Sequence, residues 1–236
     1  MAGDATDAEE EYLQSIFWLQ EAGLPMTAAN LGRAMQLSAP TVHEMIVRLE
    51  RDGYVHRDES KRLEFTDSGR LHAEGIVRRH RLIERFLTDV LNIPWDEVHE
   101  QAERLEHAMS PVLEERMLAA IGDAKTCPHG HPIESANRIV GVPLADVELG
   151  AKVRVLRFEN EAEDLLHYLK AAGMEPGHAG ELSAADDDEI TVTFAEGDAT
   201  VTRSVAETIS VTADPSPPPR AALPEQIVLG KDRYGR

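Results

Sequence analysis

Two short stretches of this chain place histidine and glutamate at spacings that could bind a metal ion. In the segment VHEQAERLEHAMS, residues 98–110, potential ligands recur at intervals of four, three and one, as His99, Glu103, Glu106 and His107. A helix over 98–110 would align these side chains along one face, because an α-helix has about 3.6 residues per turn. Imidazole and carboxylate groups bind divalent cations. The spacing therefore indicates a metal site on this helix.

A second pair of potential ligands lies upstream. His80 and Glu84 in RRHRLIERFL are four residues apart, so they would also share one helical face. Two helices that each carry a His/Glu stripe can build a metal site between them. The alternative is that both stripes are solvated surface, since charged side chains are mostly exposed. The spacing alone leaves both interpretations open.

The composition narrows the class of protein. The chain has 236 residues, of which 42% are hydrophobic, enough for packed cores in about one to three domains. It lacks the run of about 18 apolar residues that a transmembrane helix needs. Its acidic first residues do not match a signal peptide, and a single cysteine excludes an internal disulfide framework. These features predict a cytoplasmic protein.

The net charge of −19 is unfavourable for contacts with DNA phosphates, but the charge is unevenly spread. Acidic runs lie at 7–11 and 186–189, whereas residues 48–81 contain nine arginines and lysines: Arg48, Arg51, Arg57, Lys61, Arg62, Arg70, Arg78, Arg79 and Arg81. An acidic average with a local basic patch still permits DNA binding.

Residues 27–54 follow a predicted first helix over 8–22 and have the pattern of a helix-turn-helix. Thr27 can cap one short helix, and Ser38 can cap a second helix that has Pro40 in its first turn, where proline is tolerated. Two short helices around a short turn form this motif. The second helix would present polar side chains to a major groove, namely Ser38, Thr41, His43, Glu44 and Arg48.

Residues 55–65 read as a β-hairpin. Turn residues at 58–60 separate two short apolar strands, and Lys61 and Arg62 lie near the tip, where they could hold a phosphate backbone. A helix-turn-helix followed by a basic hairpin is a winged helix. A small α+β fold without DNA is the alternative.

Two further helices are predicted outside the metal stripe. Residues 66–91 read as one long helix, and Ser110 with Pro111 begins another in SPVLEERMLAAIG. The apolar side chains of the latter have few obvious partners within the chain, so they predict a dimer interface.

The segment TCPHGHPIESANRIVGVPL, residues 126–144, is loop-like. Cys127, His129 and His131 could be read as a zinc cluster. Their spacing is tighter than that of the separated ligand pairs in an ordinary structural zinc site. A structural turn is therefore the favoured interpretation.

The composition changes from Val147 onward. VRVLRF, EITVTF, ATVTRS and TISVTA alternate as strands, and a short helix, EAEDLLHYLKAAG, lies between the first two. This pattern predicts a small, mostly β barrel. The last segment, 213–236, contains PSPPP and few apolar residues, which is typical of a flexible or extended tail.

Several of these stretches together resemble the diphtheria-toxin-repressor family of metal-dependent transcriptional regulators. They are EEYLQSIFWL, LSAPTVHEMIVRLERDGYV, LEFTDSGR, RRHRLIERFL, VHEQAERLEHAMS and CPHGHPI, and the resemblance covers roughly residues 8–212. It implies a mainly α fold with a β wing, followed by a small β barrel. The implied order is a winged helix-turn-helix over 1–73, a helical dimerisation and metal-binding domain over 74–145, and an SH3-like (FeoA-like) barrel over 146–212, before a Pro-rich tail over 213–236.

The resemblance also implies two metal sites in each subunit. Carried over by position, the regulatory site would use Glu11, Glu103, Glu106 and His107. The ancillary site would use His80, Glu84 and His99. The barrel would add Glu161 and Asp164 from its helix region.

The resemblance further bears on which metal is bound. The iron-responsive pattern has methionine where this chain has Glu11 and cysteine where it has Glu103. Carboxylate and imidazole ligands suit manganese, whereas sulfur suits softer metals. Mn(II) is therefore the expected cofactor, with Fe(II) as the alternative. One departure weakens the match to manganese-responsive members, which carry glutamate where this chain has Gln14.

The implied function is a metal-dependent repressor that binds operator DNA as a homodimer and controls metal-ion homeostasis genes. The residues expected at the DNA are Thr27, Ser38, Pro40, Thr41, Glu44, Arg48, Lys61 and Arg62. A metalloenzyme and a metal-independent regulator are the rival classes. No nucleophile or acid–base motif accompanies the ligands, so no enzymatic activity is expected.

Overall fold

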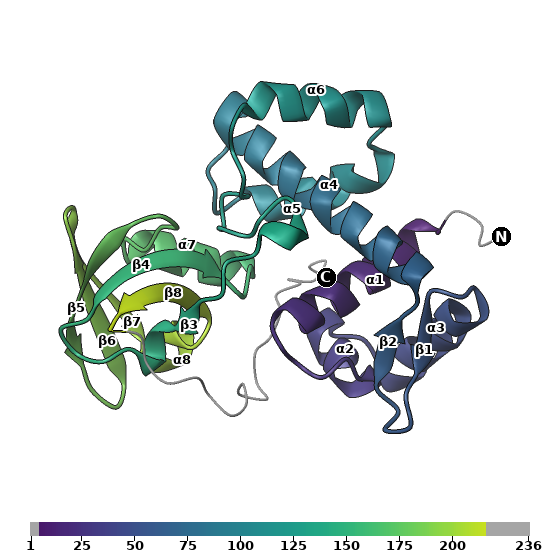
Figure 1. Ribbon diagram of the computed structural model, residues 1–236, viewed down its shortest axis with the longest axis horizontal. Coiled ribbons are helices and arrows are strands. Elements are labelled where there is room, and N and C mark those ends of the chain that lie inside the picture. The colour runs from purple at the N-terminus through teal and green to yellow at the C-terminus, as the bar shows by residue number, and fades with distance from the viewer. Residues whose placement is uncertain (1–4, 216–236) are drawn as a thin grey trace.

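The computed structural model of the chain describes residues 5–215 (Figure 1). Three units follow one another, and each has its own cluster of buried apolar side chains. The first unit is helical with a two-stranded hairpin, the second is helical, and the third contains a six-stranded antiparallel sheet. The predicted fold class is confirmed. Among the described helices, none is long and apolar enough to cross a membrane.

The first unit has the architecture of a winged helix. Its helices start where the sequence predicts, because the Thr27 hydroxyl accepts the Asn30 amide at 3.2 Å and the Ser38 hydroxyl accepts the Thr41 amide at 3.3 Å. The β1–β2 hairpin forms the wing. The elements are α1 (Asp7–Glu21), α2 (Ala28–Met35), α3 (Ala39–Arg51), β1 (Val55–Arg57) and β2 (Leu63–Phe65).

Apolar packing holds α3 against α1 and α2. Fully buried side chains recur at helical spacing, as Leu13 and Ile16 on α1 and Val42, Ile46 and Leu49 on α3. Burying each Leu or Ile contributes roughly 1.5–3 kcal/mol. Buried packing against α1 and α2 therefore fixes the orientation of the exposed face of α3.

The second unit contains α4 (Asp67–Leu91), α5 (Val98–Leu105), one 3₁₀ turn (Glu106–Ala108) and α6 (Pro111–Ile121). The prediction of one helix over 98–110 is wrong in its second half. The α-helix ends at Leu105, and the 3₁₀ turn that follows has about three residues per turn. Glu106 and His107 therefore do not continue the helical face of His99 and Glu103.

Helix α4 belongs to two units at once (Figure 1). Ala73, Ile76 and Val77 pack in the first unit, whereas Leu82 and Ile83 pack in the second. The expected boundary between residues 73 and 74 thus lies inside one continuous helix. The two units are therefore joined by a helix that contributes to the cores of both.

The third unit is built on a sheet in the order β3-β8-β4-β5-β6-β7. The sheet begins at Val142, before the expected boundary at 146, and β5 was missed because only Leu182 is buried in it. The elements are β3 (Val142–Pro143), β4 (Lys152–Phe158), α7 (Glu163–Ala171), β5 (Ala179–Ala185), β6 (Glu189–Phe194), β7 (Gly197–Thr202), α8 (Arg203–Ala206) and β8 (Ile209–Asp214). Because β8 runs to Asp214, the expected tail begins too early, and its remainder from 216 lies outside the described residues.

A tight turn near residues 126–133 joins the second unit to the third. The Cys127 amide donates to the His131 carbonyl at 2.8 Å, and the Gly130 amide donates to the Cys127 carbonyl at 3.0 Å. Gly130 has a φ of 93°, and a Cβ there would lie 1.9 Å from the Leu156 carbonyl oxygen of β4. This glycine allows the turn to press against the sheet, which brings His129 and His131 to the junction of the two units.

Candidate metal centre

Helices α4 and α5 bring His80, Glu84 and His99 together, as the resemblance implies. His80 Nε2 lies 3.0 Å from Glu84 Oε1 and 3.1 Å from His99 Nδ1, and all three residues are at most 7% exposed. Glu161, in the loop between β4 and α7, completes the group with Oε2 at 3.1 Å from His99 Nδ1. One donor atom from each of these four residues lies within 4.8 Å of the others. We call His80, Glu84, His99 and Glu161 the buried cluster.

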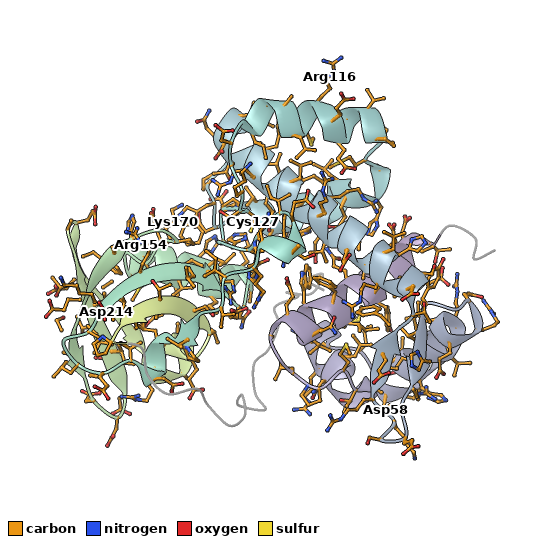
Figure 2. The ribbon with its side chains drawn as sticks, in the orientation of Figure 1. Asp58, Arg116, Cys127, Arg154, Lys170 and Asp214 are labelled. Atoms are coloured by element: carbon orange, nitrogen blue, oxygen red, sulfur yellow. The ribbon has the colours of Figure 1, made fainter. Side chains whose placement is uncertain are left out.

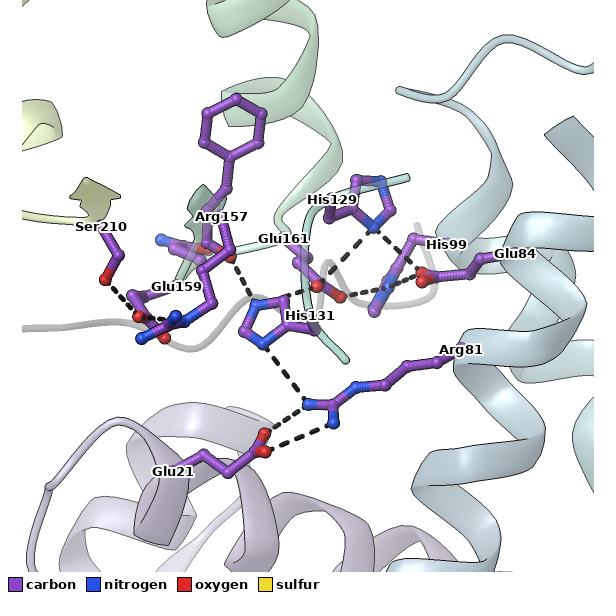
Figure 3. Close-up of polar contacts among 12 residues, drawn as sticks. Glu21, Arg81, Glu84, His99, His129, His131, Arg157, Glu159, Glu161 and Ser210 are labelled. Atoms are coloured by element: carbon purple, nitrogen blue, oxygen red, sulfur yellow. Dashed lines mark hydrogen bonds and ion pairs between the residues drawn. The ribbon is translucent and has the colours of Figure 1, made fainter. Parts of the chain in front are cut away.

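The tight turn adds donor atoms beside the buried cluster (Figure 3). His129 Nε2 donates to the Trp95 carbonyl at 2.8 Å, which leaves Nδ1 at 3.2 Å from Glu84 Oε1. Cys127 and His129 form a second group of potential ligands with Glu84 and Glu161. Cys127 lies in the interior where the helices meet the sheet unit (Figure 2).

The sequence favours a structural turn for these two residues, and the turn is present. Their additional position near Glu84 is missed because the loop supplies only part of a ligand set. The loop by itself therefore does not match a zinc site whose ligands all come from the loop's own sequence pattern. The signal was the concentration of one cysteine and two histidines in the five residues 127–131.

The chemistry of the buried cluster fits a divalent cation. Among the described residues, the buried atoms without a hydrogen-bond partner include Glu84 Oε2 in the cluster and Nδ1 of His129 beside it. Leaving a buried polar atom unsatisfied costs about 1–3 kcal/mol, so native proteins mostly avoid it. Coordination by carboxylate and imidazole is the usual way to satisfy such atoms in one place.

In the absence of a metal, protons on the histidines balance the carboxylates. Burial by itself would lower the pKa of His80, but Glu84 and Glu106 raise it to about 9. Burial likewise opposes the charge on His99, yet Glu161 and Glu84 hold its pKa well above the usual value. Burial and Glu84 both act to raise the pKa of Glu161, but neighbouring histidines lower it to about 2. At neutral pH the buried cluster is therefore a network of imidazolium and carboxylate groups.

The four residues expected at the regulatory site point to different neighbours. Glu106 is buried, accepts a hydrogen bond from Gln14 at 3.1 Å and lies 2.6 Å from His80 Nδ1. Glu103 Oε1 lies 3.8 Å from His99 Nε2. His107 Nδ1 lies 2.8 Å from the carboxylate of Glu10.

Helix α1 offers a different carboxylate to His107 from the one expected. Among the described residues, the potential ligands gathered with His107 are Asp7 and Glu10, and Glu11 is not one of them. Glu10 also pairs with Arg79 at 2.8 Å. The structure thus does not assemble Glu11, Glu103, Glu106 and His107 into one group.

His80 connects the two expected sites. Its Nδ1 faces Glu106, an expected regulatory ligand, while its Nε2 faces Glu84 and His99 in the buried cluster. Asp164, the second ligand expected from the barrel, is exposed on α7 and is absent from the groups of potential ligands found among the described residues.

Most residues expected at DNA lie on the exposed surface of the first unit. Ser38, Pro40, Thr41 and Glu44 are exposed near the start of α3, and Lys61 and Arg62 are exposed on the wing. Thr27 is partly buried and caps α2. Arg48 is turned toward α1, where its Nε pairs with Glu9 at 2.9 Å.

A second polar network links all three units (Figure 3). Glu21, at the end of α1, pairs with buried Arg81 of α4. Arg81 contacts His131 Nδ1 at 3.4 Å, and His131 Nε2 donates to the Phe158 carbonyl at 2.7 Å. Burial keeps the pKa of His131 below its usual value, which is consistent with a neutral ring in this position.

The comparisons with known proteins agree with this organisation. Residues 4–63 match the N-terminal DNA binding domain of iron dependent repressors, residues 66–135 match their metal binding and dimerisation domain, and residues 142–213 match the FeoA domain.

Individual relatives extend the match over most of the chain. The iron-dependent repressor IdeR of Mycobacterium leprae is 34% identical over 189 residues, which cover 73% of this chain and 82% of the relative. The diphtheria toxin repressor of Corynebacterium jeikeium is 31% identical over 211 residues, which cover 78% of this chain and 88% of the relative. A solved manganese-dependent transcriptional repressor in complex with manganese has a TM-score of 0.78 at 32% identity, covering 87% of this chain and 99% of its own. The chain therefore belongs to the iron-dependent repressor family, that of the diphtheria toxin repressor, whose members are metal-dependent transcriptional repressors.

Proposed function

We propose that this chain is a Mn(II)-dependent repressor that binds operator DNA as a homodimer and controls genes of metal-ion homeostasis. The observation that carries the proposal is the buried cluster, in which His80, Glu84, His99 and Glu161 converge beside the helix shared with the winged-helix unit. A group of buried ionisable side chains such as this one costs free energy unless its members are paired or bind a cation. Such a regulator acts in the cytoplasm, on DNA, and carries out no catalysis.

The donor atoms support manganese. The expected ligands Glu11, Glu103, Glu106 and His107 offer only oxygen and nitrogen, which suit Mn(II). Cys127, the only cysteine of the chain, lies beside Glu84, but burial raises the pKa of its thiol well above the usual value, which disfavours the thiolate form that softer metals prefer. Fe(II) is the second candidate, because buried Gln14 donates to Glu106 where a manganese-type site has a carboxylate.

Helix α1 is placed to carry metal binding to the DNA surface. Its first turns hold Glu9, which pairs with Arg48 of α3, and Glu10, which contacts His107. A bound cation would supply positive charge to the carboxylates of α1 and of the segment 103–107. Ordering α1 in this way would set the separation of the two α3 helices in a dimer, to match half-sites about 34 Å apart or a multiple of it. The exposed Val112 and Leu113 of α6 are the proposed dimer surface, whereas Met117 and Ile121 of the same helix, expected to have few partners within the chain, are buried in the core of the second unit.

The direct test is a gel-shift titration on operator-containing DNA upstream of a metal-transport gene. Mn(II) is expected to tighten binding at least about tenfold relative to chelator, because the metal removes a conformational cost. Fe(II), Co(II) and Zn(II) should be compared at buffered free concentrations, since raw affinities follow the Irving–Williams order. Equal binding with chelator and with every metal would contradict the proposal.

Metal binding is also expected to release protons. His80 has a pKa of about 9 and is protonated at pH 7, whereas a metal ligand must be deprotonated. Affinity for Mn(II) should therefore rise with pH up to about 9, by about tenfold per pH unit for each proton displaced. Calorimetry at pH 7 in buffers of different ionisation enthalpy should show the release of about one proton or more per bound ion. A binding enthalpy that is the same in every buffer would contradict the predicted release of protons.

A further inference from the structure

A small acidic pocket adjoins the outer side of the buried cluster. His99 and Glu161 line its inner end, and the rest of its lining comes from the α4–α5 connection, α5 and the start of α7, as Asp96, Glu97, Glu100, Glu103 and Glu163. None of its lining residues is lysine or arginine. The centre of a water molecule can move through about 10 Å³ there, which suits a single water molecule or bare cation and excludes an organic ligand.

His99 presents its two ring nitrogens to the two sides of this boundary. Nδ1 faces the buried cluster at 3.1 Å from Glu84 and from Glu161. Nε2 is buried, makes no hydrogen bond, and lies 3.8 Å from Glu103 Oε1. Because His99 lines the pocket while only 7% exposed, this unsatisfied nitrogen is available to a ligand in the pocket.

Exposure of the carboxylates falls from the rim of the pocket to its inner end. The Glu100 and Glu163 side chains are 39% and 38% exposed, whereas the Glu161 side chain is 14% exposed. The basic neighbours lie outside the lining, where Arg104 pairs with Glu100 at 3.1 Å and Lys170 pairs with Asp96. Exposed pairs such as Arg104–Glu100 are weak, at about 0–1 kcal/mol. The rim carboxylates of Glu100 and Glu163 therefore remain able to attract a divalent cation, whereas the Asp96 carboxylate, only 5% exposed, is paired with Lys170.

We propose that this acidic pocket is the route by which divalent cations reach the buried cluster, with a cation held transiently against His99 Nε2 and Glu103 on the way. The proposal rests on the proposed function, since it takes the buried cluster to bind the metal. A cleft lined by one sign of charge raises association rates of oppositely charged ligands by about 10- to 1,000-fold. The rim carboxylates would therefore govern the rate of metal uptake more than the final affinity.

The only two tryptophans of the chain provide a direct readout. The ring centroid of Trp18 lies 5.6 Å from that of His80 and 5.8 Å from that of His99. The ring centroid of Trp95 lies 6.1 Å from that of His129. Mn(II) is paramagnetic, so its arrival in the buried cluster should quench their fluorescence. Stopped-flow mixing of the full chain with Mn(II) then gives the association rate, and the titration endpoint gives affinity and stoichiometry.

The test variant is the double substitution Glu100→Gln with Glu163→Gln. Both are rim residues with i,i+4 partners, so folding should be preserved. The matched control is Glu74→Gln with Glu175→Gln, which removes the same charge from side chains that are 41% and 46% exposed, have similar partners and lie outside the pocket lining.

At low ionic strength the rim variant is expected to bind Mn(II) roughly three- to tenfold more slowly than the wild type. Added salt should slow the wild type more than the variant, because it screens the rim charges. The control should associate at the wild-type rate. An unchanged rate in the rim variant, or an equal decrease in the control, would overturn the pocket proposal while leaving the proposed function intact. Absence of any Mn(II) binding by the wild type would overturn both.

Discussion

Replacing His80 with alanine is expected to lower the affinity for Mn(II) by about 100-fold or more and to abolish metal-dependent DNA binding. Losing a residue that hydrogen-bonds to a metal ligand typically lowers metal affinity 10- to 100-fold. Losing a ligand itself should lower the affinity by at least as much. His80 also contacts Glu106 at 2.6 Å, so the substitution separates the buried cluster from the expected regulatory ligands. The same calorimetric and gel-shift titrations measure both effects.

The metal-free protein should be destabilised as well. Removing His80 leaves the buried carboxylates of Glu84 and Glu106 without their shared partner, and breaking a buried ion pair in this way costs about 3–5 kcal/mol. His80→Gln preserves most of the volume if the alanine variant does not fold. His72→Ala is the matched control, because it lies on the same helix and packs against Tyr54 away from the cluster. Wild-type Mn(II) affinity in both His80 variants would exclude His80 from the metal centre.

Local patterns allow much of the fold to be predicted. Thr27, Ser38 and Ser110 cap helices at the positions where a hydroxyl side chain precedes an apolar helical pattern, since capping depends only on nearby residues. The break at Leu105 was missed because the same spacing of ligands fits a continuous helix. Strand β5 was missed because its single buried residue, Leu182, gives no alternation.

The candidate site shows a similar division between local and distant contacts. The convergence of three ligands could be predicted because each lies on a helix whose buried face the sequence indicates. His80 and Glu84 lie on α4, and His99 lies on α5. The contact of His129 with Glu84 depends on how the turn at 126–133 docks against β4, which no periodicity encodes. The resemblance assigns Glu11 to the site with His107, whereas Glu10 is the residue that contacts His107, a contact that depends on how α1 packs in the folded chain.

The ion pair between Glu21 of α1 and Arg81 of α4 leads to the second prediction with a large expected effect. It distinguishes a structural role from a metal-binding role. Replacing Glu21 with alanine is expected to lower the free energy of unfolding of the metal-free chain by about 3–5 kcal/mol, because Arg81 is only 2% exposed and would keep its charge. Urea denaturation monitored by circular dichroism measures this. The double variant Glu21→Leu with Arg81→Met should recover most of the loss, since it removes both charges and retains apolar volume. Glu74→Ala breaks only the exposed pair with Arg70 and should change stability by less than about 1 kcal/mol.

The response of the Glu21 variant to metal is the decisive comparison with His80→Ala. Glu21 is not among the potential ligands of the buried cluster, so Mn(II) should still stabilise Glu21→Ala by about the wild-type increment, which depends only on free metal concentration and affinity. In His80→Ala that increment should largely disappear. If Glu21→Ala also lost its stabilisation by Mn(II), the ion pair at the end of α1 would be part of metal binding rather than a metal-independent link between the DNA-binding unit and α4.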